Sequence, residues 1–267
     1  MRALREACIE LAREAGAAIM AVYAQDFQVE SKADASPLTA ADLASHRIIC
    51  AGLSALKPDV PVLSEESVAI DWATRRKWSR YWLVDPLDGT REFVKKNGEF
   101  TVNIALIDNG ASVLGVVYAP ALDCLVHAES GVGAFLRDGT TDVALMTQQP
   151  APTPLRVAAS RSHLDARTAA ALEKMGATER IGMGSSLKFC RIAEGRMDVY
   201  PRFGPTSEWD TAAGQCVVEA AGGAVLTLDG APLRYNTKES LLNPDFIALG
   251  DPQLLWRAWV EGDAAHD

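Results

Sequence analysis

Apolar residues recur every three or four positions over the first 23 residues of the chain, and this spacing predicts an amphipathic helix. A second helix is expected to begin at Thr39. Thr39 would serve as its N-cap, and Asp42 would be the acidic member of a capping box. The run VPVL, residues 60–63, then predicts a short strand that leads into the polar stretch SEES.

From Tyr81 onward the chain is rich in β-branched and aromatic residues. The runs YWLV, EFTVNIALI, ASVLGVVYA and DCLVHAE predict an antiparallel meander, GAFLRDG predicts one more strand, and Asn109-Gly110 is a hairpin signal. The aromatic residues Trp72, Trp78, Tyr81 and Trp82 are interpreted as core packing, with a base-stacking surface as the alternative.

The segment TQQPAPTP, residues 147–154, contains three prolines and few apolar side chains, which is typical of a boundary. It predicts an N-terminal lobe over residues 1–148 and a C-terminal lobe over residues 149–267. Beyond it strands and helices alternate, and the last predicted helix covers PQLLWRAWVEG, residues 252–262. The predicted class is therefore α/β, with an α+β first lobe and an α/β second lobe whose sheet is largely parallel or mixed.

Composition and charge exclude several classes of protein. The 267 residues carry a net charge of −9, which disfavours binding to nucleic acid or to anionic membranes through bulk electrostatics. The five cysteines are widely spaced, so neither a disulfide framework nor a structural zinc site is expected. No apolar run is long enough to span a bilayer, and no targeting segment is recognised. The expected location is the cytoplasm, either free or at the inner face of the membrane.

The stretch WLVDPLDGTREF places Asp85 and Asp88 directly after an apolar run. Asp88-Gly89 is a strong turn signal, so an ordinary turn is one interpretation. The alternative is that the turn brings both carboxylates to one side, next to backbone N–H groups that can bind an anion. A hard divalent cation such as Mg²⁺ would resolve the conflict between carboxylates and phosphate.

Other acidic residues also stand at the ends of predicted elements. Glu65 and Glu66 follow a strand, and Asp210 begins a helix. Taken alone, Glu65 and Glu66 are better explained as solvated loop charges, and an N-cap explains Asp210 as well as a functional role does. Spacing alone does not bring these groups together.

The stretches LSEES, WLVDPLDGTREF and EWDTAAGQCVVEAAGG, in this order, resemble the inositol monophosphatase superfamily of Mg²⁺-dependent, lithium-sensitive phosphatases. The resemblance covers nearly the whole chain. It implies a layered α/β/α/β/α sugar-phosphatase fold with the active site between the two lobes.

Within that superfamily three stretches resemble the 3'(2'),5'-bisphosphate nucleotidase (CysQ-type) branch. They are SRSH at Ser160–His163, GSSLKFC at Gly184–Cys190 and VYPRFGPTSEWD at Val199–Asp210. Inositol phosphatases tend to carry an acidic residue where this chain has Arg202, and a cation suits a second phosphate. Helix N-capping or solvation remains an alternative for Ser185 and Lys188.

Carried over residue by residue, the resemblance implies a complete site. The metal ligands would be the side chains of Glu65, Asp85, Asp88 and Asp210 and the main-chain carbonyl of Leu87. Substrate contacts would come from Leu87, Asp88, Gly89, Thr90, Ser185, Lys188, Arg202 and Asp210. The catalytic set would be Glu65, Glu66, Thr90 and Asp42.

The resemblance implies hydrolysis of the 3'-phosphate of adenosine 3',5'-bisphosphate to AMP and phosphate, assisted by two or three Mg²⁺ ions. Thr90 would orient the attacking water, Glu65 or Glu66 would accept its proton, and Asp42 would support Thr90. The partner is thus a small nucleotide bisphosphate, with no nucleic acid and no membrane span, and the protein is expected to be a monomer or a homodimer.

Two alternatives remain open. The first is an inositol monophosphatase, or another sugar-phosphate phosphatase, on the same fold. The second, from a different class, is a non-catalytic regulatory partner protein, which the complete set of acidic residues disfavours. Phosphate release measured side by side on the nucleotide and on inositol 1-phosphate distinguishes the first alternative from the nucleotidase. Absence of any activity would favour the second.

Overall fold

The computed structural model describes residues 1–25, 29–31, 37–67, 70–159 and 165–260. The helices are α1 (Arg2–Tyr23), α2 (Ala40–Leu56), η1 (Glu65–Ser67), α3 (Trp72–Arg75), α4 (Thr90–Val94), η2 (Pro120–Leu122), α5 (Ala166–Met175), α6 (Leu187–Ala193), α7 (Glu208–Ala220) and α8 (Arg257–Val260). The strands are β1 (Val29–Ser31), β2 (Pro37–Thr39), β3 (Val62–Ser64), β4 (Arg80–Asp88), β5 (Thr101–Asp108), β6 (Ala111–Ala119), β7 (Cys124–Glu129), β8 (Gly133–Asp138), β9 (Thr141–Leu145), β10 (Leu155–Ala159), β11 (Thr178–Gly182), β12 (Val199–Arg202), β13 (Ala224–Thr227) and β14 (Phe246–Leu249).

Within these residues the strands form two large sheets and the small hairpin β1-β2. The seven-stranded sheet runs in the order β3-β4-β5-β6-β7-β8-β9, and every pair after β3-β4 is antiparallel. The five-stranded sheet has the order β11-β10-β12-β14-β13 and is mixed, because β14 runs antiparallel to both of its neighbours. The predicted meander and the predicted mixed sheet are both confirmed.

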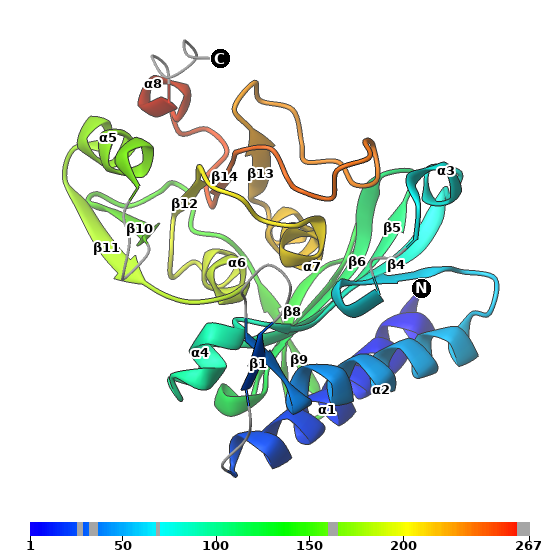
Figure 1. The fold of residues 1–267 in the computed structure, drawn as a ribbon. Helices are drawn as coiled ribbons and strands as arrows, with labels where there is room; N and C mark the ends of the chain where they lie inside the picture. Colours follow the sequence, from blue (N-terminus) through cyan, green and yellow to red (C-terminus); the bar gives the residue numbers. More distant parts are fainter. Residues whose placement is uncertain (26–28, 32–36, 68–69, 160–164, 261–267) are drawn as a thin grey trace.

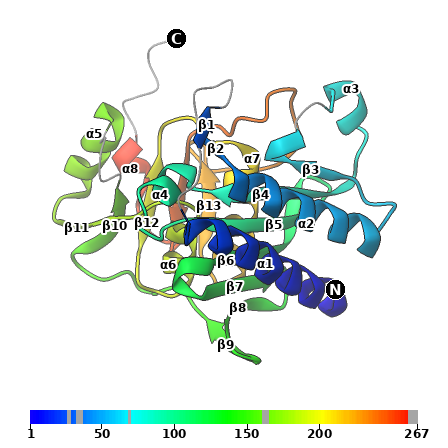
Figure 2. The same cartoon turned by 60° about the horizontal axis from the view of Figure 1, so that its bottom comes forward.

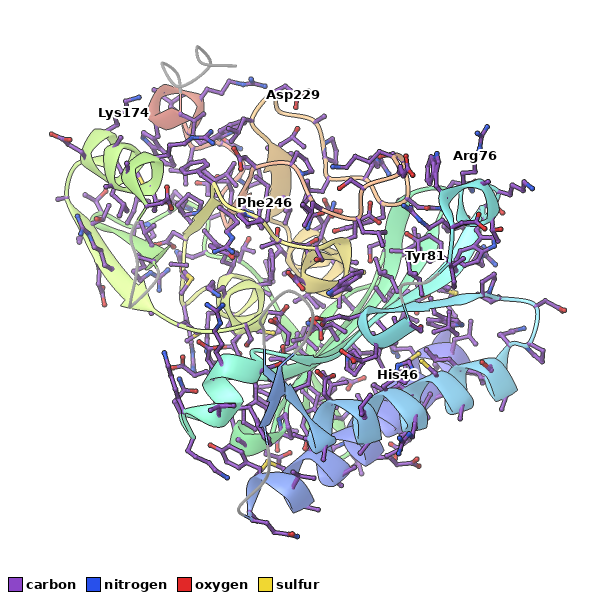
Figure 3. The ribbon with its side chains drawn as sticks, viewed as in Figure 1. His46, Arg76, Tyr81, Lys174, Asp229 and Phe246 are labelled. Atoms are coloured by element: carbon purple, nitrogen blue, oxygen red, sulfur yellow. The ribbon has the colours of Figure 1, made fainter. Side chains whose placement is uncertain are left out.

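Helices cover both sheets in layers. Helices α1 and α2 pack on one face of the seven-stranded sheet, α6 and α7 lie between the two sheets, and α5 and α8 lie beyond the five-stranded sheet (Figures 1 and 2). Apolar clusters fill the spaces between the layers, and Tyr81 of β4 and Phe246 of β14 belong to the same cluster around α6 and α7 (Figure 3). The expected α/β/α/β/α arrangement is confirmed.

Strand β4 sits between two of these clusters. Tyr81 and Leu83 contribute to the core around α7, and Trp82 and Val84 contribute to the core under α1 and α2. Successive side chains of a strand point to opposite faces, so burial on both faces gives the continuous apolar run seen in the sequence. These contacts confirm that Tyr81 and Trp82 serve as core packing. The same contacts hold the part of the strand that precedes Asp85 in place.

One predicted helix differs from the structure, and one strand of the seven-stranded sheet was not predicted. The helix predicted over residues 252–262 is wrong in its start, since α8 begins at Arg257, and residues 261 and 262 lie outside the described residues. The Asp251 carboxylate accepts a hydrogen bond from the backbone of Gln253, and such a local bond competes with helix formation. Strand β9 was not predicted, because its largely exposed residues at the sheet edge lack an apolar alternation.

The chain passes from the seven-stranded to the five-stranded sheet between Leu145 and Leu155. Division into two lobes at residue 148 stays a prediction. Among the described helices, none combines the length and the apolar character needed to cross a bilayer.

Candidate metal and phosphate site

The irregular C-terminal end of β4 turns so that its polar backbone and side-chain groups lie together. The pairing of β4 with β5 shifts register between Asp85 and Asp88, where Pro86 lacks an N–H to donate. The Asp85 carboxylate accepts a hydrogen bond of 3.1 Å from the backbone N–H of Leu87. Gly89 then takes φ 88°, a left-handed conformation that glycine adopts without strain, and caps α4.

Three carboxylates meet at this turn. One oxygen from each of Asp85, Asp88 and Asp210 lies within 4.8 Å of the other two. Asp210 comes from the first turn of α7, where it also closes a capping box by accepting a 2.9 Å hydrogen bond from the backbone of Ser207. The capping role expected as an alternative for Asp210 and its place in the acidic cluster therefore coexist.

The electrostatics of the cluster favour a bound cation. Burial raises the pKa of Asp85 well above its ordinary value, and the charges of Glu65, Asp88 and Asp210 raise it further. Burial and the charge of Asp88 raise the pKa of Asp210 to about 8. Oxygen ligands held in mutual repulsion fit a hard divalent cation, which would offset the repulsion directly.

Two of the other predicted acidic residues, Glu65 and Asp42, act on this cluster. Glu65 opens η1, and Asp42 is fully buried on α2; the charges of both raise the pKa of Asp85. Burial lowers the pKa of His46 on α2, and the charge of Glu66 acts in the opposite direction on that pKa. Thr90 opens α4, and its hydroxyl donates a 3.3 Å hydrogen bond to the Leu87 carbonyl, so these two expected groups lie together.

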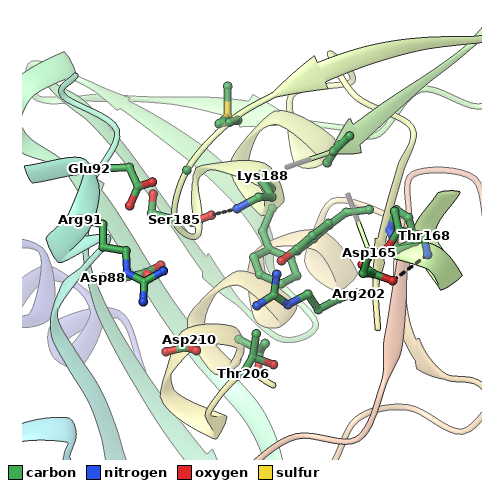
Figure 4. Close-up of a pocket in the computed structure, with 18 residues that line it drawn as sticks. Asp88, Arg91, Glu92, Asp165, Thr168, Ser185, Lys188, Arg202, Thr206 and Asp210 are labelled. Atoms are coloured by element: carbon green, nitrogen blue, oxygen red, sulfur yellow. Dashed lines mark hydrogen bonds between the residues drawn. The ribbon is translucent and has the colours of Figure 1, made fainter. Parts of the chain in front are cut away.

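A cavity of about 390 Å³ opens beside the acidic cluster (Figure 4). The residues that line it are Asp88, Arg91, Glu92, Ala158, Ala159, Asp165, Thr168, Met183, Gly184, Ser185, Lys188, Phe189, Tyr200, Pro201, Arg202, Thr206, Asp210 and Thr211. Arg91 and Arg202 approach the cavity from opposite sides in Figure 4. The cavity therefore combines an acidic end with cationic walls.

The cations of the C-terminal part are held by backbone carbonyls. The Lys188 ammonium donates a 2.9 Å hydrogen bond to the Ser185 carbonyl and lies 5.1 Å from the centre of the Tyr200 ring. Burial lowers the pKa of Lys188, while the charge of Asp88 raises it. Arg202 donates a 3.0 Å hydrogen bond to the Pro205 carbonyl. The stretch Ser160–His163 lies outside the described residues.

The sequence assigned Ser186 only to a helix start, Ser185–Ser186, that would bind the nucleotide, and its contact with the acidic cluster was not predicted. Its backbone N–H donates a 2.6 Å hydrogen bond to the Asp88 carboxylate, and its hydroxyl donates to the same oxygen. Both Ser185 and Ser186 lie in the quoted stretch GSSLKFC, and nothing in the sequence distinguishes them. Arg91 was also missed, because its exposed position on α4 resembles that of any surface cation.

The fold and the acidic loop match known proteins. Residues 1–256 match the model of the inositol monophosphatase family. The 3'(2'),5'-bisphosphate nucleotidase CysQ of Escherichia coli strain K12 is 53% identical over 239 residues, covering 89% of this chain and 96% of that protein. The protein of the same name from Salmonella typhimurium strain LT2 is 51% identical, and the match covers 91% of this chain and 98% of that protein.

The crystal structure of CysQ from Bacteroides thetaiotaomicron, described as a bacterial member of the same family, superimposes with a TM-score of 0.82. It is 43% identical and covers 93% of this chain and 97% of that chain. The layered architecture thus defines a protein of the inositol monophosphatase fold. The chain belongs to the inositol monophosphatase family, which confirms the resemblance seen in its motifs.

Proposed function

We propose that this protein is a Mg²⁺-dependent 3'(2'),5'-bisphosphate nucleotidase. It would hydrolyse the 3'-phosphate of adenosine 3',5'-bisphosphate to AMP and phosphate. The observation that carries the proposal is one cavity that Asp88 and Asp210 of the three-carboxylate cluster line at one end and the cations Lys188 and Arg202 line in its wall. Two relatives that are 53% and 51% identical to this chain, over 89% and 91% of its length, bear the name of this activity.

The acidic end would hold two or three Mg²⁺ ions. The proposed ligands are the carboxylates of Glu65, Asp85, Asp88 and Asp210 and the carbonyl of Leu87. When bound, the metal supplies Lewis-acid chemistry that lowers the pKa of water and offsets the charge of the transferred phosphate. The raised pKa values of Asp85 and Asp210 support this, because a cation favours the ionised form of each.

The chain's own groups would orient the reactants. The N–H groups of Gly89 and Thr90 face the phosphate, and the Thr90 hydroxyl orients the attacking water. Glu65 or Glu66 would accept the proton from that water, and the buried Asp42 would support Thr90. Attack in line with the leaving ribose oxygen needs no covalent enzyme intermediate.

Lys188, Arg202 and the segment at Ser185 would bind the second phosphate. Two cations at this place give a −9 protein a locally favourable surface for a multiply charged nucleotide. The same negative net charge supports a small-molecule substrate rather than nucleic acid.

Phosphate release from adenosine 3',5'-bisphosphate, measured with added Mg²⁺ and with a chelator, tests the proposal. We expect release that requires Mg²⁺ and that falls at least about 100-fold in Asp88→Asn. A purified, folded protein without activity on any phosphate monoester would instead favour the regulatory role. Full activity of Asp88→Asn would contradict the metal mechanism.

A further inference from the structure

Ser186 lies where four elements meet. It directly precedes α6, and its hydrogen-bond partners come from the end of β4, from β5 and from α7. Its side chain is 1% exposed, as is that of Asn103 on β5. Water is therefore excluded, and each of these polar groups depends on its protein partners.

The hydrogen-bond geometry orients the Ser186 hydroxyl. The Asn103 amide donates a 3.0 Å hydrogen bond to the Ser186 oxygen, which leaves the single hydroxyl hydrogen to be donated onward. Two acceptors lie in range, the Asp88 carboxylate at 2.9 Å and the backbone carbonyl of Asp210 at 2.8 Å. The one hydrogen is shared between these two acceptors, so Ser186 joins the turn that carries Asp88 to the helix that carries Asp210.

Both donors of Ser186 reach the same oxygen of Asp88. The backbone N–H is 2.6 Å and the hydroxyl 2.9 Å from Oδ2, so Oδ1 is the oxygen that these donors leave available. Two donors on one carboxylate oxygen restrict rotation of the carboxylate and fix the direction of the other oxygen.

The segment before Ser186 is held in place by other contacts. The backbone N–H of Gly184 donates a 2.9 Å hydrogen bond to the Glu99 carboxylate. A Cβ atom at Gly184 would lie 2.6 Å from Cγ of Glu92, which shows how closely this segment approaches the residues after β4. The position of Ser186 therefore does not depend on Asp88 alone.

We propose that Ser186, oriented by Asn103, is a positioning residue that fixes the Asp88 carboxylate relative to Asp210 for metal binding. This inference rests on the proposed function, in which Asp88 and Asp210 are metal ligands. Ser186 touches neither metal nor substrate in this account. Its contribution is the geometry of two ligands that come from segments more than a hundred positions apart in the chain.

Binding of Mn²⁺ in the absence of substrate tests the inference, since it needs no catalysis. Electron paramagnetic resonance of free Mn²⁺ gives the dissociation constant for the unchanged protein, Ser186→Ala and Asn103→Leu. We expect Ser186→Ala to weaken Mn²⁺ binding about 10-fold or more, which is typical when the partner of a metal ligand is removed. Ser112→Ala is the matched control, because this buried serine of β6 pairs with Ile107, away from the acidic end of β5.

The double variant Asn103→Leu/Ser186→Ala separates positioning from general destabilisation. If Asn103 acts through Ser186, the double variant binds Mn²⁺ no more weakly than Ser186→Ala. Melting temperatures measured in chelator show that each variant is folded, and Asn103→Leu alone provides the test if Ser186→Ala fails to fold.

Unchanged Mn²⁺ affinity in Ser186→Ala, or fully additive losses in the double variant, would overturn the inference. Failure of the proposed function looks different: the unchanged protein would then bind Mn²⁺ without releasing phosphate, or would not bind Mn²⁺ at all.

Discussion

The hydroxyl of Ser45 donates a hydrogen bond of 2.7 Å to the backbone carbonyl of Pro86. Ser45 is a fully buried residue of α2, so this helix supports the acidic turn from the side opposite to the cavity. The turn between Asp85 and Asp88 is thus held by a neighbouring layer of the fold as well as by its own backbone.

Replacing Ser45 with alanine should therefore destabilise the protein. The Pro86 carbonyl would lose its donor in a buried place, and we expect the free energy of unfolding to fall by about 1–3 kcal/mol. Urea denaturation measures this change. Ser54→Ala, at an exposed serine of the same helix, is the control and should leave the midpoint unchanged. Equal midpoints for both variants would show that the Ser45 bond contributes nothing.

Gly89 is the second support of the turn, through its left-handed backbone. A Cβ atom there would lie 3.1 Å from the Glu99 carbonyl, in addition to the strain of φ 88°. We expect Gly89→Ala to cost more than the roughly 1–2 kcal/mol of backbone strain alone. Gly139→Ala is the matched control, because Gly139 has φ 58° with nothing within 4 Å of the added atom. Thermal denaturation of both variants compares the costs, and a smaller loss at Gly89 would contradict this role.

The raised pKa of Asp210 predicts how stability depends on pH in the metal-free protein. The folded state binds a proton that the unfolded state releases between the ordinary value of 3.8 and about 8. The free energy of unfolding should therefore fall as the pH rises through this window. Melting temperatures in chelator at about pH 5 and about pH 8 measure the fall, and Asp210→Asn should reduce it. A melting temperature that rises across this window in chelator would contradict the account of the acidic cluster.

The sequence predicted the antiparallel meander and the acidic turn well, because both depend on local patterns, whereas the layered arrangement followed from the family resemblance. The burial of β4 on both faces appears as an apolar run, and the turn signal at Asp88-Gly89 is a backbone property of those two residues. Convergence of Asp210 on Asp88 was not derivable from spacing and rested on the family resemblance. The contact of Ser186 with the acidic cluster was not predicted, because it depends on Asn103 and Asp88, which only the folded chain brings to Ser186.

Arg202 should contribute to the choice of substrate. Its guanidinium lines the cavity wall, where we propose that it binds the second phosphate. Arg202→Glu should raise KM for adenosine 3',5'-bisphosphate by about 10-fold or more, with a smaller effect on inositol 1-phosphate, which has no second phosphate. Steady-state kinetics on both substrates measure this. Arg180→Glu makes the same charge change at an exposed residue of β11 and controls for net charge. Equal effects of the two substitutions would contradict a direct contact.

The central claim is that the acidic cluster and the cationic wall together recognise a nucleotide bisphosphate. The most direct test measures kcat/KM for phosphate release from adenosine 3',5'-bisphosphate and from inositol 1-phosphate side by side with Mg²⁺, and repeats both with lithium added. The account predicts a kcat/KM at least about 10-fold higher for the bisphosphate, which corresponds to about 1.4 kcal/mol of preferential transition-state binding. An equal or higher kcat/KM for inositol 1-phosphate would contradict it and favour a sugar-phosphate phosphatase on the same fold.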